Sequence, residues 1–251
     1  MSAEGLEADL ARDADGPLLQ ERQRHATFVS TLAHELRQPL SALSQAVDLM
    51  RLVSGSPSAS LAAEIIQRQT RRMTRLVEDL MDSARCAQGK MTLRLQRVDV
   101  RQVVADAALD ATAAVAARGQ QFEVSIAPTP LWVDADPERL QQVLSNLLDN
   151  AVKYTAPGGR IHLAAGRANA AITVRVSDTG RGLEPRALAH IFDMFSQVRP
   201  DEGAGLGLGL SIALEIVTRH RGRIEARSEG HGLGSEFIVT LPMATIVGIN
   251  R

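Results

Sequence analysis

The sequence predicts a multidomain protein of 251 residues, in which a helical hairpin precedes an α/β domain. In the first third of the chain, apolar residues recur every three or four positions, the spacing of helices packed along one stripe. Beyond it, short strand-like and helix-like segments alternate and are bounded by glycine and proline, which is typical of a layered α/β fold. These two patterns together define the predicted fold class.

The composition sets limits on the function. A hydrophobic content of 45% is enough for a packed core, and a net charge of −1 argues against a nucleic-acid partner. No uncharged apolar run reaches the ~18 residues of a membrane helix, so we expect no membrane span. Cys86 is the only cysteine, which excludes an intramolecular disulfide and fits a reducing compartment. We therefore expect a cytoplasmic protein.

The predicted hairpin spans residues 18–88, after an N-terminal segment 1–17 that we expect to be disordered or frayed. A turn-like segment, 54–60, separates its two helices. One hairpin cannot bury both heptad stripes well, so we predict a homodimer in which two hairpins form a four-helix bundle. The first stripe comprises Val29, Leu32, Leu36, Leu40, Leu43, Val47 and Met50. The second comprises Ala62, Ile66, Gln69, Met73, Leu76, Leu80 and Ser83.

A histidine beside a carboxylate marks the first of these helices. His34 precedes Glu35, and Pro39 follows within the same helical pattern. His34 lies about 200° around the helix from both Leu32 and Leu36, so it points away from the packed stripe. A proline inside a helix costs about 3 kcal/mol and kinks it. A kink next to this pair indicates a chemical site.

The α/β domain is expected over residues 92–243, between a linker at 89–91 and a tail at 244–251. Asp136 and Pro137 form a typical helix start, as an N-cap followed by proline at the first helical position. We expect Trp132 to pack in the sheet and the helices to cover one face of a mostly antiparallel sheet. The predicted strands are 92–95, 122–126, 131–133, 160–165, 171–177, 223–228 and 235–241. The predicted helices are 100–118, 136–154, 186–195 and 210–220.

Three polar residues share one face of the helix 136–154. Asn146 and Asn150 are four residues apart, and Lys153 follows three residues later. Two amide oxygens and a lysine suit a hydrated Mg2+ ion and a phosphate, because Mg2+ prefers oxygen ligands and keeps its waters. The alternative is an ordinary polar helix face.

Asp178 ends a predicted strand and is followed by Gly180 and Gly182. Glycines allow a backbone to approach a ligand closely, and the carboxylate can accept a hydrogen bond from an exocyclic amine such as that of adenine. The alternative is an ordinary Asp-Thr-Gly turn.

A glycine-rich segment, 203–212, leads directly into the helix 210–220. Unpaired N–H groups at such a helix start bind phosphate. The segment alone is weak evidence, and it has neither the Rossmann nor the Walker pattern.

Taken together, these segments resemble the catalytic core of two-component sensor histidine kinases. Several motifs agree with that family in order and spacing. They are the phospho-acceptor box at 34–40, the asparagine box at 144–155, the first glycine box at 178–182, the phenylalanine box at 191–195, the second glycine box at 205–212 and the closing strand at 234–242.

The resemblance implies a Bergerat (GHKL) α/β sandwich that binds ATP and Mg2+. His34 would attack the γ-phosphate with Glu35 as its general base, and Asn150 would coordinate Mg2+ beside Asn146. Asp178 would bind the adenine amine. The residues implied in nucleotide binding are Asn146, Asn150, Lys153, Tyr154, Asp178, Gly180, Gly182, Gly205, Leu206, Gly207, Leu208 and Gly209.

The resemblance also implies partners. The phosphoryl group would pass to an aspartate of a response regulator receiver domain. Because only residues 1–17 precede the hairpin, we expect sensing to belong to a separate sensor protein, or the chain to be a fragment. Two alternatives remain at this point: a non-catalytic, nucleotide-binding adaptor that docks on another kinase or regulator, and a related ATPase or serine-directed kinase. The histidine box at 34–40 disfavours the latter.

Overall fold

The computed structural model describes residues 32, 33, 36, 39–48, 50, 57–196 and 206–244. Its internal contacts divide the chain into two units. The helical unit comprises Met1–Leu80 with Arg199–Leu206, and the α/β unit comprises Met81–Val198 with Gly207–Arg251. A helical region followed by a mixed α/β domain confirms the predicted fold class.

The described part of the helical unit comprises helical residues 32, 33, 36, 39–48 and 50, most of α2 (Pro57–Ala87), and Leu206. On α2, the predicted stripe residues Ala62 and Leu76 are buried, whereas Val77 is 48% exposed. Leu40 on the preceding helix is 50% exposed. A single chain thus leaves apolar side chains of the hairpin open to solvent. Within the described residues, no helix combines the length and the apolar character needed to cross a membrane.

The α/β unit contains a five-stranded sheet in the order β2-β4-β5-β7-β6 and a separate pair, β1-β3. In the large sheet only β2 and β4 are parallel, and all other neighbours are antiparallel. The strands are β1 (Gln96–Asp99), β2 (Gln121–Ile126), β3 (Trp132–Ala135), β4 (Arg160–Ala168), β5 (Ala171–Asp178), β6 (Arg223–Arg227) and β7 (Ser235–Pro242). The helices are α3 (Val100–Ala117), α4 (Pro137–Tyr154), α5 (Pro185–Leu188) and α6 (Gly209–Arg219).

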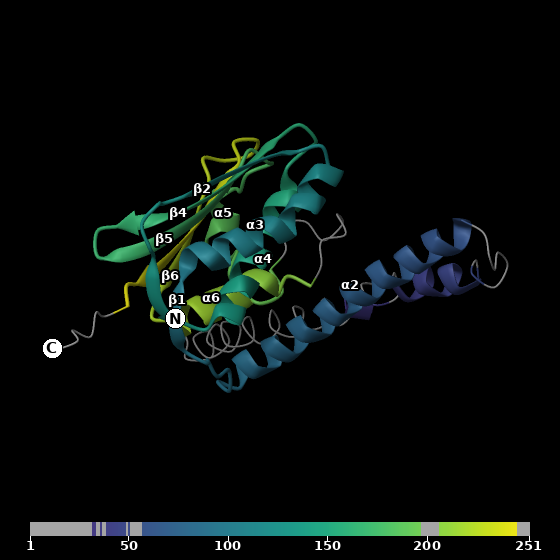
Figure 1. Cartoon of the computed structure of the whole chain (residues 1–251), viewed down its shortest axis with the longest axis horizontal. Helices are drawn as coiled ribbons and strands as arrows, with labels where there is room; N and C mark the ends of the chain where they lie inside the picture. Colours follow the sequence, from purple (N-terminus) through teal and green to yellow (C-terminus); the bar gives the residue numbers. More distant parts are fainter. Residues whose placement is uncertain are drawn as a thin grey trace, which may run out of the picture. The chain divides into compact units, whose positions relative to one another are not determined.

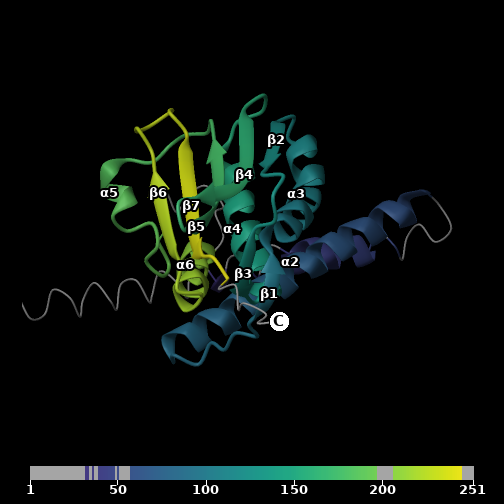
Figure 2. The same ribbon diagram turned by 60° about the vertical axis from the view of Figure 1, so that its left-hand side comes forward.

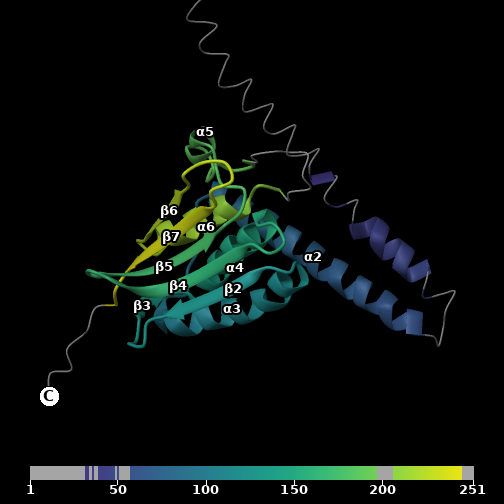
Figure 3. The same ribbon diagram turned by 90° about the horizontal axis from the view of Figure 1, so that it is seen from above.

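Helices α3, α4 and α6 lie together on one face of the large sheet (Figures 1 and 3). Helix α3 contacts β2 and β4, α4 contacts β5, and α6 contacts β6. Figure 2 shows the strands side by side from β6 to β2. The alternating side chains that face the helices form the core. They include Ile161, Leu163, Ile172, Val174, Val176, Ile224, Phe237, Val239 and Leu241, all buried.

The opposite face of the sheet carries several charged pairs. Arg175 on β5 lies 3.8 Å from Glu236 on β7. On β6, the carboxylate of Glu225 lies 2.9 Å from Arg223 and 3.3 Å from Arg227. One apolar and one charged face explain why the predicted strands alternate in sequence.

The start of α4 forms as the sequence predicts and carries an additional long-range contact. Asp136 caps the helix by accepting a hydrogen bond from Arg139 N, and its other oxygen accepts from Arg94 N at 2.9 Å. Buried His220, which follows α6, accepts a hydrogen bond at Nε2 from Asp136 N at 2.9 Å. Its Nδ1 donates to Ile216 O at 2.8 Å. A neutral imidazole in one tautomer therefore links the start of α4 to the end of α6.

The last turns of α2 belong to the α/β unit through a buried carboxylate. Asp82 accepts hydrogen bonds from Arg139 at 2.5 Å and from Gln142 at 2.9 Å, both on α4. After the helix, Gly89 O accepts from Arg219 of α6 at 3.2 Å. The contacts of the α/β unit thus start at Asp82, which precedes the linker predicted at 89–91.

Two predicted elements are wrong in extent. The strand predicted at 92–95 is instead β1 (Gln96–Asp99), because its partner β3 ends where Asp136 begins to cap α4, and pairing therefore starts at Gln96. The helix predicted at 186–195 is the short α5, followed by turns. Phe195 takes a left-handed conformation with φ 63°, and its N–H donates to Gly207 O instead of to a helix carbonyl.

The prediction for Trp132 is also wrong. Its side chain is 40% exposed, and the Arg97 guanidinium lies 5.5 Å from the ring centroid. Both residues are on the small β1-β3 pair, which is too narrow to cover a tryptophan.

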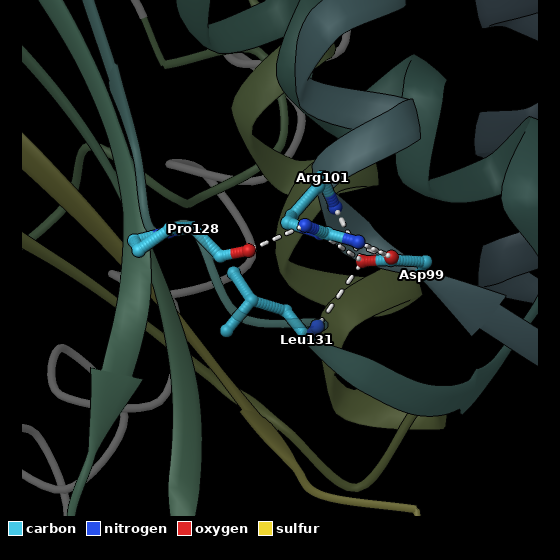
Figure 4. Close-up of polar contacts among 4 residues, drawn as sticks. All are labelled: Asp99, Arg101, Pro128 and Leu131. Carbon is cyan, nitrogen blue, oxygen red and sulfur yellow. Dashed lines mark hydrogen bonds and ion pairs between the residues drawn. The ribbon is translucent and has the colours of Figure 1, made fainter.

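Asp99 joins the end of β1 to the start of α3 and to the segment before β3 (Figure 4). It accepts hydrogen bonds from the backbone N–H groups of Arg101 and Leu131, both at 3.1 Å. The Arg101 guanidinium also donates to Asp99, and it reaches Pro128 O at 2.8 Å. These bonds, the one from the Arg101 side chain above all, hold the pKa of the Asp99 carboxyl below its usual range.

The Asp99→Asn substitution is expected to lower the free energy of unfolding by about 1–2 kcal/mol at neutral pH, the scale of a lost helix cap. Because the folded pKa is depressed, the stabilisation is present above the unfolded pKa and lost as pH falls through the folded one. The difference between the two proteins in urea unfolding should therefore shrink as the pH falls below about 4, the ordinary pKa of an aspartate. Asp106→Asn on the exposed side of α3 is the control, and an equal effect there would contradict the prediction.

Candidate functional site

Asp178 is the central carboxylate of the candidate site and ends β5. One oxygen accepts a hydrogen bond from Gly180 N at 2.7 Å, and the other accepts from Ser235 Oγ at 2.6 Å. Ser235 begins β7 and is paired with Asp178 in the antiparallel register. Burial raises the pKa of the Asp178 carboxyl, although both hydrogen bonds act in the opposite direction. The structure thus presents an oriented, partly desolvated acceptor.

The glycines after Asp178 are required by the packing of the protein's own backbone. A Cβ on Gly180 would collide with Tyr154 O, and one on Gly182 would collide with Gly230 O. Gly182 also has φ 68°, a left-handed conformation that favours glycine. The turn after Asp178 therefore lies directly against the end of α4.

The asparagine face of α4 meets the start of α6. Asn146 Nδ2 donates to Gly209 O at 2.9 Å, so its amide oxygen remains an acceptor. A Cβ on Gly209 would lie 3.3 Å from Asn146 Cγ, which makes this approach close. Asn150, one turn further along α4, is partly exposed.

The donor set on this face suits Mg2+. No group of three or more His, Cys, Asp or Glu residues that could hold a metal occurs in the described part of the chain. A metal at Asn146 and Asn150 would draw on their amide oxygens, water and ligand phosphates, and Mg2+ prefers oxygen ligands of this kind.

Lys153 and Tyr154 end α4 next to the Asp178 turn. The Lys153 ammonium lies 4.9 Å and the Arg181 guanidinium 4.0 Å from the centroid of the Tyr154 ring. Arg181 N also donates to Tyr154 O at 3.2 Å. Two cations therefore lie within cation–π distance of one aromatic ring.

The glycine-rich segment is described from Leu206 onward. Gly207 has φ 68°, and a Cβ there would lie 2.7 Å from Ser196 O. Leu206 and Leu208 are buried, and Gly209 is the first residue of α6. Gly205 lies outside the described residues, as do His34 and Glu35 of the predicted phospho-acceptor site.

The structure thus groups the predicted residues into two neighbouring clusters joined by α4. One contains Asp178, the turn glycines, Lys153 and Tyr154, and the other contains Asn146 with the start of α6. The residue-by-residue prediction missed Ser235 and Arg181. Both lie inside motifs that the sequence does show, the closing strand 234–242 and the first glycine box 178–182. A motif, however, does not predict which of its side chains contact one another.

Two family models match the chain in this order. The His Kinase A (phospho-acceptor) domain matches residues 24–89. The histidine kinase-, DNA gyrase B- and HSP90-like ATPase family matches residues 135–245, which include both clusters.

Known proteins resemble the chain over nearly its whole length. The sensor histidine kinase TrcS of Mycobacterium tuberculosis (strain ATCC 25618 / H37Rv) is 34% identical over 96% of this chain and 47% of its own length. The adaptive-response sensory kinase SasA of Thermosynechococcus vestitus (strain NIES-2133 / IAM M-273 / BP-1) is 35% identical over 95% of this chain and 67% of its own. The crystal structure of full-length ShkA in complex with AMPPNP matches with a TM-score of 0.66 and 30% identity, over 87% of this chain and 46% of ShkA. The chain thus spans between about half and two thirds of the length of these relatives.

The phospho-acceptor match, the ATPase match behind it and the likeness to SasA over two thirds of that protein agree. The chain belongs to the sensor histidine kinase family.

Proposed function

We propose that this chain is the catalytic core of an ATP-dependent protein histidine kinase, which phosphorylates itself on His34 and passes the phosphoryl group to an aspartate of a response regulator. The single observation that supports this most directly is Asp178, a partly buried acceptor oriented by Gly180 and Ser235 beside the end of α4. The ATPase family match over the same residues and the AMPPNP in the ShkA crystal structure support it further.

In this proposal the chain has two functional domains. Residues 18–88 form the dimerisation and phosphotransfer hairpin, and residues 92–243 form the ATP-binding domain after a linker at 89–91. Homodimerisation through the hairpin is supported by its exposed apolar side chains, which a second copy would cover. Among the described residues these include Leu40, Val47, Met50, Val77 and Met81.

The nucleotide would bind across the two clusters. Asp178 would accept a hydrogen bond from the exocyclic amine of adenine, and Tyr154 and Lys153 would contact the nucleotide from the end of α4. The backbone N–H groups at the start of α6, a glycine-rich helix terminus, would bind the phosphates. Asn150 and Asn146 would hold Mg2+, which, when bound, neutralises part of the phosphate charge.

Transfer requires a neutral imidazole at His34. Its ring nitrogen would form the new bond to the γ-phosphorus while the bond from phosphorus to the bridging oxygen of ADP breaks. Glu35 would take the ring proton as general base. Phosphoryl transfer of this kind depends mainly on positioning and on charge stabilisation.

Incubation with ATP labelled in the γ-phosphate is expected to give an acid-labile, base-stable phosphoprotein. The His34→Ala variant should not be labelled, whereas His25→Ala, which changes a neighbouring histidine, should be labelled normally. Equal labelling of His34→Ala would overturn the assignment of the acceptor. Binding of ATP without any labelling would instead favour the non-catalytic adaptor.

The Asn150→Asp variant is expected to lose at least about 100-fold in labelling rate, because the new carboxylate repels the phosphates and disturbs the proposed Mg2+ site. Asn169→Asp makes the same chemical change in the exposed turn between β4 and β5 and should be labelled normally. Dimerisation, measured by light scattering, should persist in both variants. Normal labelling of Asn150→Asp would contradict the proposed metal site.

A further inference from the structure

The last turn of α4 is held at its carbonyl groups by residues far along the chain. Val152 O accepts hydrogen bonds from Arg118 at 2.6 Å and from Gln120 at 2.9 Å. Gln120 also donates to Thr155 O at 2.6 Å, and Tyr154 O accepts from Arg181 N. The backbone beneath Tyr154 is therefore fixed on both sides, and the orientation of its ring is then set by the side-chain torsions.

The backbone of Arg181 is fixed equally well. Its N–H donates to Tyr154 O, and its carbonyl accepts from Gly232 N. Its neighbours Gly180 and Gly182 pack so closely that neither admits a side chain. Arg181 is thus the one residue between Asp178 and Leu183 with a long side chain, and it projects from a rigid turn.

The Arg181 guanidinium lies over the Tyr154 ring. Its carbon is 4.0 Å from the ring centroid, well inside the ~6 Å range of a cation–π contact. The Lys153 ammonium is more distant, at 4.9 Å. Only Arg181 can also stack its plane on the ring, since guanidinium is planar and ammonium is not.

We propose that Arg181 is a positioning residue of the nucleotide site: it holds the Tyr154 ring in one orientation and thereby sets the affinity for ATP. This inference rests on the proposed function, because it assigns the ring to the nucleotide. An aromatic side chain that is ordered before binding loses less conformational freedom when the ligand arrives, which strengthens binding. Arg181 acts through Tyr154 and need not touch the nucleotide.

Tyr154 is the only tyrosine in the chain, so it can be observed directly. Protein labelled with 13C in the tyrosine ring should give one set of ring NMR signals, shifted by the guanidinium. In the Arg181→Gln variant these signals should shift, without any nucleotide present, because the ring loses its contact with the guanidinium. Arg181→Lys, which keeps the charge but not the plane, should give an intermediate position, and Arg186→Gln on exposed α5 should leave the signals unchanged.

The functional consequence is measured on the same proteins by calorimetric titration with ATP. Arg181→Gln should weaken ATP binding roughly three- to tenfold, Arg181→Lys less, and Arg186→Gln not at all. In autophosphorylation the KM for ATP should rise by the same factor while kcat stays constant, a split that a general loss of stability would not produce.

The experiments distinguish a failure of the role proposed for Arg181 from a failure of the proposed function. Unchanged ring signals, or an unchanged ATP affinity in Arg181→Gln when the unaltered chain binds ATP, would overturn the role of Arg181 and leave the proposed function intact. If the unaltered chain does not bind ATP, the proposed function is wrong, and so is the proposed effect of Arg181 on ATP affinity.

Discussion

The Asp178→Asn variant is expected to bind ATP at least about 10-fold more weakly than the unaltered chain, without loss of thermal stability. The carboxylate is the proposed acceptor for the adenine amine, and a hydrogen bond to a charged group contributes about 1.5–3 kcal/mol. In the variant, one of the two acceptor oxygens becomes an amide that donates instead of accepting. Calorimetric titration with ATP measures the change.

The stability of this variant follows from the sign of the pKa shift. Burial raises the pKa of Asp178, so the folded state disfavours the charged carboxylate. The stability that this group contributes is fully present below its unfolded pKa and is lost as pH rises through the folded pKa. At neutral pH the charge is therefore unfavourable for folding, and the neutral amide should unfold at the same temperature or a higher one.

The same shift predicts the pH dependence of binding. As the pH is lowered, protonation of Asp178 removes the charged acceptor. Because the pKa of Asp178 is raised, ATP affinity should begin to fall at a higher pH than it would with an ordinary aspartate. Asp134→Asn on the exposed side of β3 is the matched control and should change neither affinity nor unfolding temperature. An unaltered ATP affinity in Asp178→Asn, or a large drop in its unfolding temperature, would contradict this role.

Replacement of His220 by alanine is expected to lower the free energy of unfolding by about 2–4 kcal/mol. The substitution removes the bond to Ile216 O and leaves the Asp136 N–H without its acceptor in a buried place. It also opens a cavity between the start of α4 and the end of α6. Urea unfolding of the full chain, followed by circular dichroism, measures the loss.

His231→Ala, at an exposed position after β6, is the matched control and should change the free energy of unfolding by less than about 0.5 kcal/mol. If the two variants unfold at the same urea concentration, the imidazole link does not stabilise the fold. Because α4 also carries the asparagine face, we further expect His220→Ala to weaken ATP binding.

Elements whose signals are local could be predicted from the sequence. The start of α4 is the clearest case, since Asp136, Pro137 and the apolar spacing behind them lie within a few residues of one another. The α3 and α6 helices and the core strands were predicted within a few residues of their ends for the same reason. Two elements were predicted with wrong bounds, the strand at 92–95 and the helix at 186–195. In both, contacts with residues distant in the sequence set where the element lies.

In the candidate site, too, features with local signals could be predicted and features set by distant contacts could not. Helical spacing places Asn146, Asn150 and Lys153 on one side of α4, and the Asp-Thr-Gly pattern identifies Asp178, all without a structure. The roles of these residues in binding remain predictions, as do those of His34 and Glu35.

The alternating and heptad patterns, the helix starts and the glycine positions can be read locally, because each depends on neighbours within a turn or two. Long-range pairs follow from packing alone: Ser235 contacts Asp178 across 57 residues, and His220 contacts Asp136 across 84. The same holds for the Arg181 guanidinium, which lies over the Tyr154 ring. Such pairs depend on which strands are neighbours, in which register, and on which helix covers them. These are properties of the whole packed core, and no local spacing rule contains them.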